Sequence, residues 1–264
     1  MNNITLPSPH KILDVIHETN AEYTFRVAYD DHDNIMYGQF FQLSIPKVGE
    51  APISVSGKGD KWLEFTIRKV GKLTNGIFGL QPGDMVFMRG PYGNYFPVDE
   101  FKSKDLVVIA GGTGLAAVRA LLNHFYEYPE EIKSVNFIAG FKDINSVLFE
   151  YDLKKFKTKF NAIYTLDNTR EDGFETGMVT AYIEKIPFST FKDYNVIIVG
   201  PPVMMHFAAK ECLARGAEES KIWVSLERKM SCAVGKCGHC KINGTYICLD
   251  GPIFNYTRAK DLID

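Results

Sequence analysis

The stretch LVVIAGGTGLAAV, residues 106–118, decides the fold of the central part of this chain. Its first five residues are all apolar, as in a strand that is buried on both faces of a sheet. Three glycines and a threonine follow, and an amphipathic helix is then predicted through Phe125. A strand, a glycine-rich turn and a helix in this order predict the first unit of a parallel sheet covered by helices.

The same buried-strand pattern recurs between helical stretches up to about Val224. Further strands are predicted at 134–140, 161–166, 195–199 and 221–225. A helix is predicted over residues 202–213, and Cys212 within it should be a buried core thiol. Residues 101–225 are therefore predicted to form an α/β domain with a parallel sheet.

Residues 1–100 have the rhythm of an antiparallel β domain. Short β-prone runs are separated by polar, glycine and proline turns, and several such strands predict a small barrel. The predicted strands are 11–17, 22–29, 39–45, 62–70 and 85–88, and the predicted turns are 30–34, 81–84 and 90–94.

Composition indicates a soluble cytoplasmic protein. Of 264 residues, 45% are hydrophobic, and 30 basic and 32 acidic residues give a net charge of −2. This balance shows no bias toward nucleic acid or a membrane surface, and no apolar run reaches the roughly 18 residues of a membrane span. Five cysteines without an export signal fit a reducing compartment.

Four cysteines mark the C-terminal part, residues 226–264. Cys232, Cys237, Cys240 and Cys248 follow the pattern C-x4-C-x2-C-x7-C, which is similar to the plant-type spacing for a [2Fe–2S] cluster. Glycines between them let the backbone curl around one centre. A structural zinc site and disulfides are the alternatives. The segment has too little apolar sequence for its own core, so metal binding should supply much of its fold.

Two loops after predicted strands are candidates for a nucleotide. Each loop alone is equally consistent with a strand-to-helix turn that binds nothing. Because both should lie at the carboxyl edge of one sheet, where open α/β sheets bind ligands, the combination favours a dinucleotide site. The candidate residues are Gly111, Gly112, Thr113, Gly114, Gly200, Pro201, Pro202 and Met204.

Three segments of the barrel part offer hydroxyls, cations and free backbone N–H groups, which a diphosphate requires. They are residues 51–56, 66–74 and 89–94. Lysines at exposed strand edges, kept for solubility, are the alternative explanation. The candidate cofactor-binding residues are Pro52, Ser54, Thr66, Arg68, Gly71 and Thr74.

The series of motifs resembles the ferredoxin–NADP reductase superfamily. Its cysteine module resembles the branch of dihydroorotate dehydrogenase electron-transfer subunits, and most of all the B subunits of anaerobic sulfite reductases. The resemblance implies a β-barrel that binds FAD, an α/β parallel-sheet domain that binds NADH, and a small C-terminal [2Fe–2S] module. Gly140-Phe141-Lys142-Asp143 offers one lysine but no arginine pair for a 2′-phosphate, so NADH is expected rather than NADPH.

The superfamily's flavin motif, Arg-x-Tyr-Ser or Arg-x-Tyr-Thr, falls on residues 51–54. Ser54 matches, and the resemblance implies that it lies beside the isoalloxazine. Ala51 stands where the family has a diphosphate-pairing arginine, and Arg68 is the candidate for that missing charge. Gly71 and Thr74 match the segment that contacts the diphosphate.

The implied function is to pass electrons from NADH through FAD and the cluster to a partner. For a sulfite reductase this partner is a sirohaem-bearing catalytic subunit, with a further ferredoxin-like iron–sulfur subunit. Hydride transfer between cofactors needs no side-chain acid or base, so no catalytic residue is predicted. Three alternatives are a subunit of dihydroorotate dehydrogenase or a hydrogenase, a stand-alone NADH–ferredoxin oxidoreductase, and a zinc-stabilised binding module.

Overall fold

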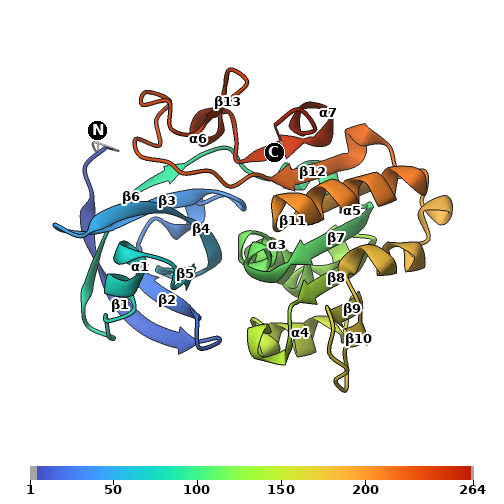
Figure 1. Ribbon diagram of the computed structural model, residues 1–264, viewed down its shortest axis with the longest axis horizontal. Coiled ribbons are helices and arrows are strands. Elements are labelled where there is room, and N and C mark those ends of the chain that lie inside the picture. The colour runs from blue at the N-terminus through green and yellow to red at the C-terminus, as the bar shows by residue number, and fades with distance from the viewer. Residues whose placement is uncertain (1–4, 263–264) are drawn as a thin grey trace. The chain divides into compact units, whose positions relative to one another are not determined.

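The computed structural model describes residues 5–262, which group into two compact units (Figure 1). The barrel unit contains Met1–Phe96 and Glu227–Pro252. The α/β unit contains Pro97–Leu226 and Ile253–Asp264. The predicted domain boundaries at 1–100, 101–225 and 226–264 stay a prediction.

The barrel unit is built on six antiparallel strands that close into a barrel in the order β1-β2-β5-β4-β3-β6. Apolar residues at alternate positions, such as Phe41 and Leu43, fill its interior. The intervening Gln42 therefore points to the outer face. The strands are β1 Ser8–His17, β2 Glu22–Ala28, β3 Phe40–Ile45, β4 Gly49–Gly59, β5 Trp62–Arg68 and β6 Met85–Tyr92, and helix α1 spans Lys72–Ile77.

The predicted barrel is confirmed, and one predicted turn is wrong in part. Residues 90–94 were expected to form a turn because they contain two glycines and a proline. Strand β6 instead continues to Tyr92, which pairs with Phe40 of β3. An irregularity in the register between Phe40 and Gln42 accommodates Pro91, which has no N–H to donate.

The cysteine module, residues 227–252, has little regular structure. Its elements are β13 Lys241–Ile242, β14 Thr245–Tyr246 and α6 Ile247–Asp250. It belongs to the barrel unit.

The α/β unit is built on a seven-stranded sheet with the order β10-β9-β8-β7-β11-β12-β15. Neighbouring strands are parallel except at β15, which runs antiparallel to β12. The strands are β7 Asp105–Gly111, β8 Ser134–Phe141, β9 Asn161–Leu166, β10 Glu175–Thr176, β11 Tyr194–Val199, β12 Ile222–Ser225 and β15 Ile253–Asn255. The predicted parallel sheet is therefore confirmed.

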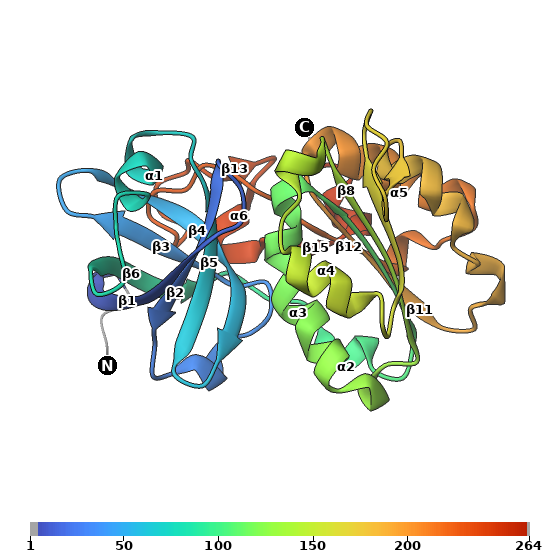
Figure 2. The same ribbon diagram turned by 90° about the horizontal axis from the view of Figure 1, so that it is seen from below.

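Helices cover both faces of this sheet, as right-handed crossovers require. From β7 the chain moves outward through β8 to β9, which puts α3 and α4 on one face. The chain then returns to the other side of β7, which puts α5 on the opposite face (Figure 2). The helices are α2 Val98–Phe101, α3 Leu115–Glu127, α4 Glu150–Phe156, α5 Pro202–Ala214 and α7 Tyr256–Ala259.

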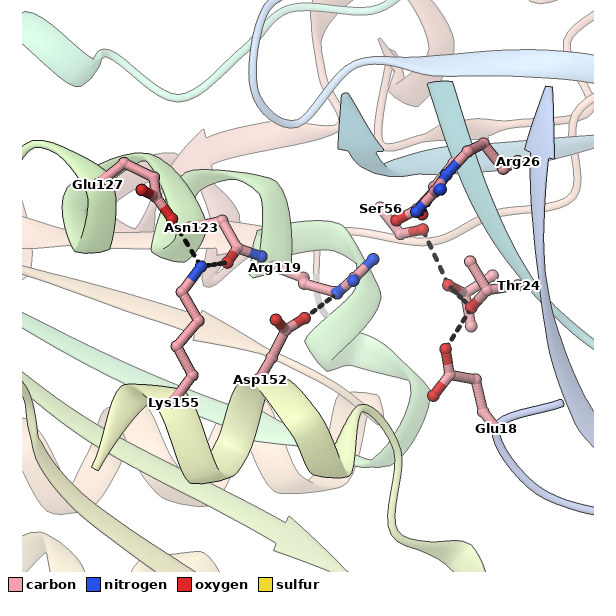
Figure 3. A network of polar contacts seen from close by, with 11 residues as sticks. Glu18, Thr24, Arg26, Ser56, Arg119, Asn123, Glu127, Asp152 and Lys155 are labelled. Atoms are coloured by element: carbon pink, nitrogen blue, oxygen red, sulfur yellow. Dashed lines mark hydrogen bonds and ion pairs between the residues drawn. The ribbon is translucent and has the colours of Figure 1, made fainter. Parts of the chain in front are cut away.

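Polar contacts join α3 to α4 (Figure 3). Arg119 Nε donates to Asp152 Oδ2 at 2.5 Å. Lys155 Nζ donates to Glu127 Oε1 at 2.7 Å and to Asn123 Oδ1 at 3.1 Å. The two helices are thereby fixed side by side.

Within the described chain, no helix is long and apolar enough to cross a membrane.

Candidate functional site

The cysteine loop is wound so that its backbone N–H groups point at sulfur atoms. The N–H groups of Val234, Lys236 and Cys237 lie 3.3–3.4 Å from Cys232 Sγ. The N–H of Gly235 lies 3.3 Å from Cys248 Sγ. Such donors stabilise negative charge on a thiolate, which is the ligand form of cysteine.

Positive φ angles produce this winding. Gly235 has φ 68° and Gly238 has φ 80°, as the predicted curl of the backbone requires. A β-carbon at Gly235 would also lie 2.9 Å from Leu249 Cδ2. Glycine at position 235 is therefore needed for its φ angle, whereas the exposed side chain of Leu249 can move away from a β-carbon.

The four cysteines form two pairs. The side chain of Cys232 contacts that of Cys237, and the side chain of Cys240 contacts that of Cys248. Among residues 5–262, no three His, Cys, Asp or Glu side chains are arranged around a single metal ion. Two thiolates for each of two irons is the arrangement that a [2Fe–2S] cluster requires, so the two pairs fit this group.

The two pairs differ in their surroundings. Cys237 is exposed, and backbone N–H groups, first that of His239, lower the pKa of its thiol to about 7. Cys248 is buried, and desolvation raises the pKa of its thiol to about 12. Cys248 would therefore be deprotonated by the metal itself, because a coordinated thiol loses its proton outright.

The α/β unit contains a cavity of about 1160 Å³ at the carboxyl ends of its strands. Gly111 and Gly112 after β7 and Pro201 and Met204 after β11 line this cavity. The chain leaves β7 and β11 toward opposite sides of the sheet, which is the switch point at which such sheets bind ligands. The two predicted nucleotide loops are therefore brought together.

Glycines allow these two loops to touch. A β-carbon at Gly114 would lie 2.6 Å from the Cα of Gly200. By contrast, a β-carbon at Gly112 would meet nothing within 4 Å, although its φ of +51° disfavours a side chain. Gly114 and Gly200 thus hold the loops together, whereas Gly112 leaves space open toward a ligand. Thr113 and Pro202 do not line the cavity; Pro202 begins α5, as predicted.

The cavity also contains residues that the sequence did not single out. Helix α5 presents Phe207 and Lys210, Arg215 follows this helix directly, and Asp167 follows β9. The available sequence signal was that α5 has apolar residues on more than one face: Val203 and Phe207 are exposed, whereas Ala208 and Cys212 are buried.

The barrel candidates lie on two neighbouring strands and the turn that follows. Pro52 and Ser54 are half-buried on β4, and Thr66 lies on β5 beside it. The hydroxyl of Thr66 lies 2.8 Å from the hydroxyls of both Ser56 and Thr24, and Thr24 donates to Glu18 (Figure 3). Thr66 is thus one member of a chain of hydroxyl groups.

Arg68, Gly71 and Thr74 lie at the end of β5 and the start of α1. Arg68 Nε lies 3.1 Å from Glu22 Oε1, and 61% of the arginine side chain is exposed. Thr74 Oγ1 accepts from the N–H groups of Val70 and Gly71, both at 2.9 Å. Thr74 therefore caps the helix, and the roles predicted for these three residues toward a diphosphate stay predictions.

Two parts of the chain match known families. Residues 108–210 match the oxidoreductase NAD-binding domain. Residues 227–260 match the iron–sulfur cluster binding domain of dihydroorotate dehydrogenase B.

Curated relatives match almost the whole chain. Sulfhydrogenase 1 subunit gamma of Pyrococcus furiosus is 34% identical over 93% of this chain and 89% of its own length. A probable dihydroorotate dehydrogenase B (NAD(+)) electron transfer subunit of Methanopyrus kandleri is 34% identical over 82% of this chain and 78% of its own.

Solved structures share the fold. An NADH-dependent reduced ferredoxin–NADP oxidoreductase has a TM-score of 0.80 and 21% identity, covering 94% of this chain and 88% of its own. A ferredoxin–NADP⁺ reductase from Neisseria gonorrhoeae, solved with FAD and NADP, has a TM-score of 0.71 and 20% identity, covering 83% of this chain and 97% of its own.

A barrel, an NAD-binding domain and an iron–sulfur cluster binding domain define an oxidoreductase with the fold of ferredoxin–NADP reductases. The chain belongs to the family that includes sulfhydrogenase gamma subunits and dihydroorotate dehydrogenase B electron transfer subunits. The predicted NAD(H) and iron–sulfur cluster agree with the two matched domains, and the Neisseria gonorrhoeae reductase of the same fold binds FAD.

Proposed function

We propose that this protein takes electrons from NADH and passes them to a separate catalytic subunit. The observation that carries the proposal is the paired arrangement of four cysteines inside a loop of N–H donors, in a chain that also holds a dinucleotide cavity. When bound, FAD supplies hydride acceptance and single-electron release, and the cluster supplies one-electron transfer.

The residues of the chain hold and orient these groups. Gly111 and Gly112 let the backbone approach a pyrophosphate, and the N-terminus of α3, which follows them directly, favours its negative charge. Pro201 and Met204 line the same cavity after β11. We assign the nicotinamide half of NADH to that side.

On the barrel, the proposed flavin residues divide by chemistry. Ser54 offers a hydroxyl to the isoalloxazine, beside Pro52 on β4. Arg68 offers positive charge to the diphosphate. Thr66 and Thr74 act through their hydrogen bonds to neighbouring residues, and Gly71 lets the chain enter α1. Cys232, Cys237, Cys240 and Cys248 hold the cluster.

For the partner, we propose the sirohaem-bearing catalytic subunit of an anaerobic sulfite reductase, joined by a ferredoxin-like iron–sulfur subunit. The resemblance of the whole series of motifs to the B subunits of anaerobic sulfite reductases supports this assignment, whereas Pro-Ile-Ser at 52–54 is common to the electron-transfer branch. The five cysteines of the chain suffice for one cluster, so sulfite chemistry would take place on the partner. We also place the complex in the cytoplasm, where thiolates stay reduced.

A hydrogenase is the second candidate for the partner. The 34% identity to sulfhydrogenase 1 subunit gamma over 93% of the chain specifically favours it. Dihydroorotate dehydrogenase is the next alternative, on the relationship to its electron transfer subunits.

Anaerobic purification of the native complex tests these assignments. Every co-eluting subunit is identified, and the complex is assayed with NADH for sulfite reduction, hydrogen evolution and orotate reduction. We expect a sirohaem subunit and NADH-dependent sulfite reduction. Hydrogen evolution by the purified complex would replace the first candidate with the second. NADH-dependent reduction of ferredoxin by a native preparation that contains no other subunit would contradict both.

A further inference from the structure

The guanidinium of Arg89 joins strand β6 of the barrel to the cysteine loop. Its Nη1 donates to the carbonyl oxygen of Cys232 at 2.8 Å, and its Nη2 donates to the carbonyl oxygen of Ser231 at 2.7 Å. Only 8% of the arginine side chain is exposed. A buried cation therefore contacts the backbone of the first cysteine in the loop.

The remaining contacts of Arg89 fix the orientation of its guanidinium group. Nε donates to Glu50 Oε2 at 2.9 Å, Nη2 donates to Glu50 Oε1, and Nη1 donates to Tyr92 Oη at 3.1 Å. The hydrogen bond to Glu50 holds the pKa of Arg89 above its usual range. A bidentate arginine pair is rigid, so the N–H groups that face the loop have fixed directions.

A second contact fastens the other end of the cysteine module. The N–H of Asn94 donates to the carbonyl oxygen of Gly251 at 2.7 Å, and Asn94 Nδ2 donates to the carbonyl oxygen of Asp250 at 3.0 Å. A β-carbon at Gly93 would lie 2.6 Å from Pro252 Cδ. The two contacts bracket the four cysteines, one at Cys232 and one just after Cys248.

Arg89 thus attaches the cysteine loop to the barrel at Cys232, where the direction of the backbone decides the N–H contacts to sulfur. Three backbone N–H groups converge on Cys232 Sγ, and they do so only while the backbone at residue 232 keeps its direction. Gln42, the register partner of Arg89, is fully buried although it faces outward from the barrel. Arg89 and Glu50 form a bidentate pair with little net charge, so the contribution of Arg89 to the loop lies in its fixed hydrogen bonds.

We propose that Arg89 is a positioning residue for the cluster, which fixes the backbone at Ser231 and Cys232. This inference rests on the proposed function, because it requires a cluster on the four cysteines. Because Glu50 balances the charge of Arg89, the arginine acts through the backbone: it keeps the three N–H groups directed at Cys232 Sγ. Hydrogen bonds to a ligand sulfur stabilise the more negative, reduced cluster, so Arg89 raises the reduction potential of the cluster and slows its loss.

Two variants separate the charge of Arg89 from its hydrogen-bonding geometry. Arg89→Met removes both at similar side-chain length, and Arg89→Lys keeps the charge without the planar set of donors. Arg26→Met is the matched control, because Arg26 forms the same kind of pair with buried Glu64 at 2.7 Å in the same barrel. The measurements are iron content, the rate of iron loss to a chelator, and the midpoint potential of the cluster from a redox titration followed by electron paramagnetic resonance.

Arg89→Met should have a more negative midpoint potential and an affinity for iron lower by on the order of 10- to 100-fold, seen as faster iron loss. Arg89→Lys keeps the charge but not the planar set of donors, so it should change in the same direction as Arg89→Met in both measurements, by a smaller amount. Arg26→Met should match the parent in both measurements.

Parental potential and iron-loss rate in Arg89→Met would overturn the inference, as would an equal effect of Arg26→Met. If Arg89→Met does not fold, a parental iron-loss rate in Arg89→Lys overturns it. A parent purified anaerobically without any cluster would overturn the proposed function as well, whereas a cluster-bearing parent with unaffected variants removes only the role of Arg89.

Discussion

At the scale of single residues, Arg68 has two candidate partners: the carboxylate of Glu22 and the diphosphate of FAD. It lies 3.1 Å from Glu22, yet most of its side chain is exposed. The N–H groups of Val70 and Gly71 already donate to Thr74, so these two donors are not free for a diphosphate. Arg68 therefore stays the candidate for the positive charge that an arginine supplies in the family and that Ala51 does not.

Arg68→Ala should weaken FAD binding about ten- to a hundredfold, because a charge-assisted hydrogen bond contributes about 1.5–3 kcal/mol. Equilibrium flavin titration measures the effect. Glu22→Gln is the control: it removes the ion-pair partner but leaves the arginine, so it should bind FAD at least as tightly as the parent. Equal FAD affinity in the parent and Arg68→Ala would contradict a role of Arg68 in FAD binding and leave only its ion pair with Glu22.

The thiol of Cys212 gives a dependence of stability on pH. Burial in α5 raises its pKa to about 12, from an ordinary value near 9. Below pH 9 the thiol is neutral in both folded and unfolded chains, so its contribution to stability is complete. Between pH 9 and 12 only the unfolded chain ionises, so this contribution is lost as the pH rises.

Above pH 9, the free energy of unfolding of the parent should fall more steeply than that of Cys212→Ala. The difference in slope should approach about 1.4 kcal/mol per pH unit. Urea denaturation at several pH values measures both slopes. Parallel slopes would mean that Cys212 reaches solvent in the folded protein.

Arg89 also marks a limit of sequence reasoning. The sequence showed a cation beside two glycines at 89–94, which suggested a cofactor contact. Its partners at Ser231 and Cys232 lie more than 140 positions away in the chain, and no local pattern specifies such a pairing. The cysteines, by contrast, could be singled out locally, because all four lie within 17 residues and their spacing favours a [2Fe–2S] cluster over zinc or disulfides.

At the scale of elements, the strands that are buried on both faces were the ones that the sequence predicted most accurately. The strands β7, β8, β9, β11 and β12 were predicted to within a residue at each end, because strands buried on both faces are continuous apolar runs. Strand β4 was not among the predicted strands, since its polar, glycine and proline residues suggest a loop and only pairing with β3 and β5 makes it a strand. The role of α5 residues in lining the cavity was also not predictable, because the cavity is formed by elements that are far apart in the sequence.

The two glycines that open α3 should respond differently to alanine. Gly112→Ala meets open space, so its cost is about 1–2 kcal/mol for the left-handed conformation, together with a large loss of NADH affinity from the methyl group. Gly114→Ala collides with the backbone of Gly200 and should destabilise the whole α/β unit by more than that.

Thermal unfolding and NADH titration of both variants, with flavin and iron contents as a check, distinguish the two effects. Unchanged NADH affinity in a folded Gly112→Ala protein would place the dinucleotide elsewhere in the cavity.

At the scale of the whole molecule, the cysteine module should depend on its metal while the remaining chain does not. Its strands are two residues long and its helix is four residues long, so little besides the cluster and the contacts to β6 orders it. Cys237→Ser should lose the cluster and become sensitive to trypsin at the exposed Lys236 and Lys241. NADH should still reduce the flavin, but electron delivery to a partner should fail.

Cys212→Ala is the control, because it also removes one cysteine but should retain iron and resist cleavage at these lysines. Mass spectrometry of the first tryptic fragments gives the result. Early cuts elsewhere in Cys237→Ser, with residues 236 and 241 still protected, would show that the contacts to the barrel order the module without metal.

The pairing of Ser225 with Ile253 has a consequence for how such a chain can be assembled. These residues lie side by side on adjacent antiparallel strands, so everything from 226 to 252 departs from and returns to one place on the sheet. A short hairpin could join β12 to β15 and leave the strand order of both units untouched. Residues 226–252 can therefore be inserted, exchanged for another segment or deleted as one piece. The remaining chain then keeps the connectivity of its strands.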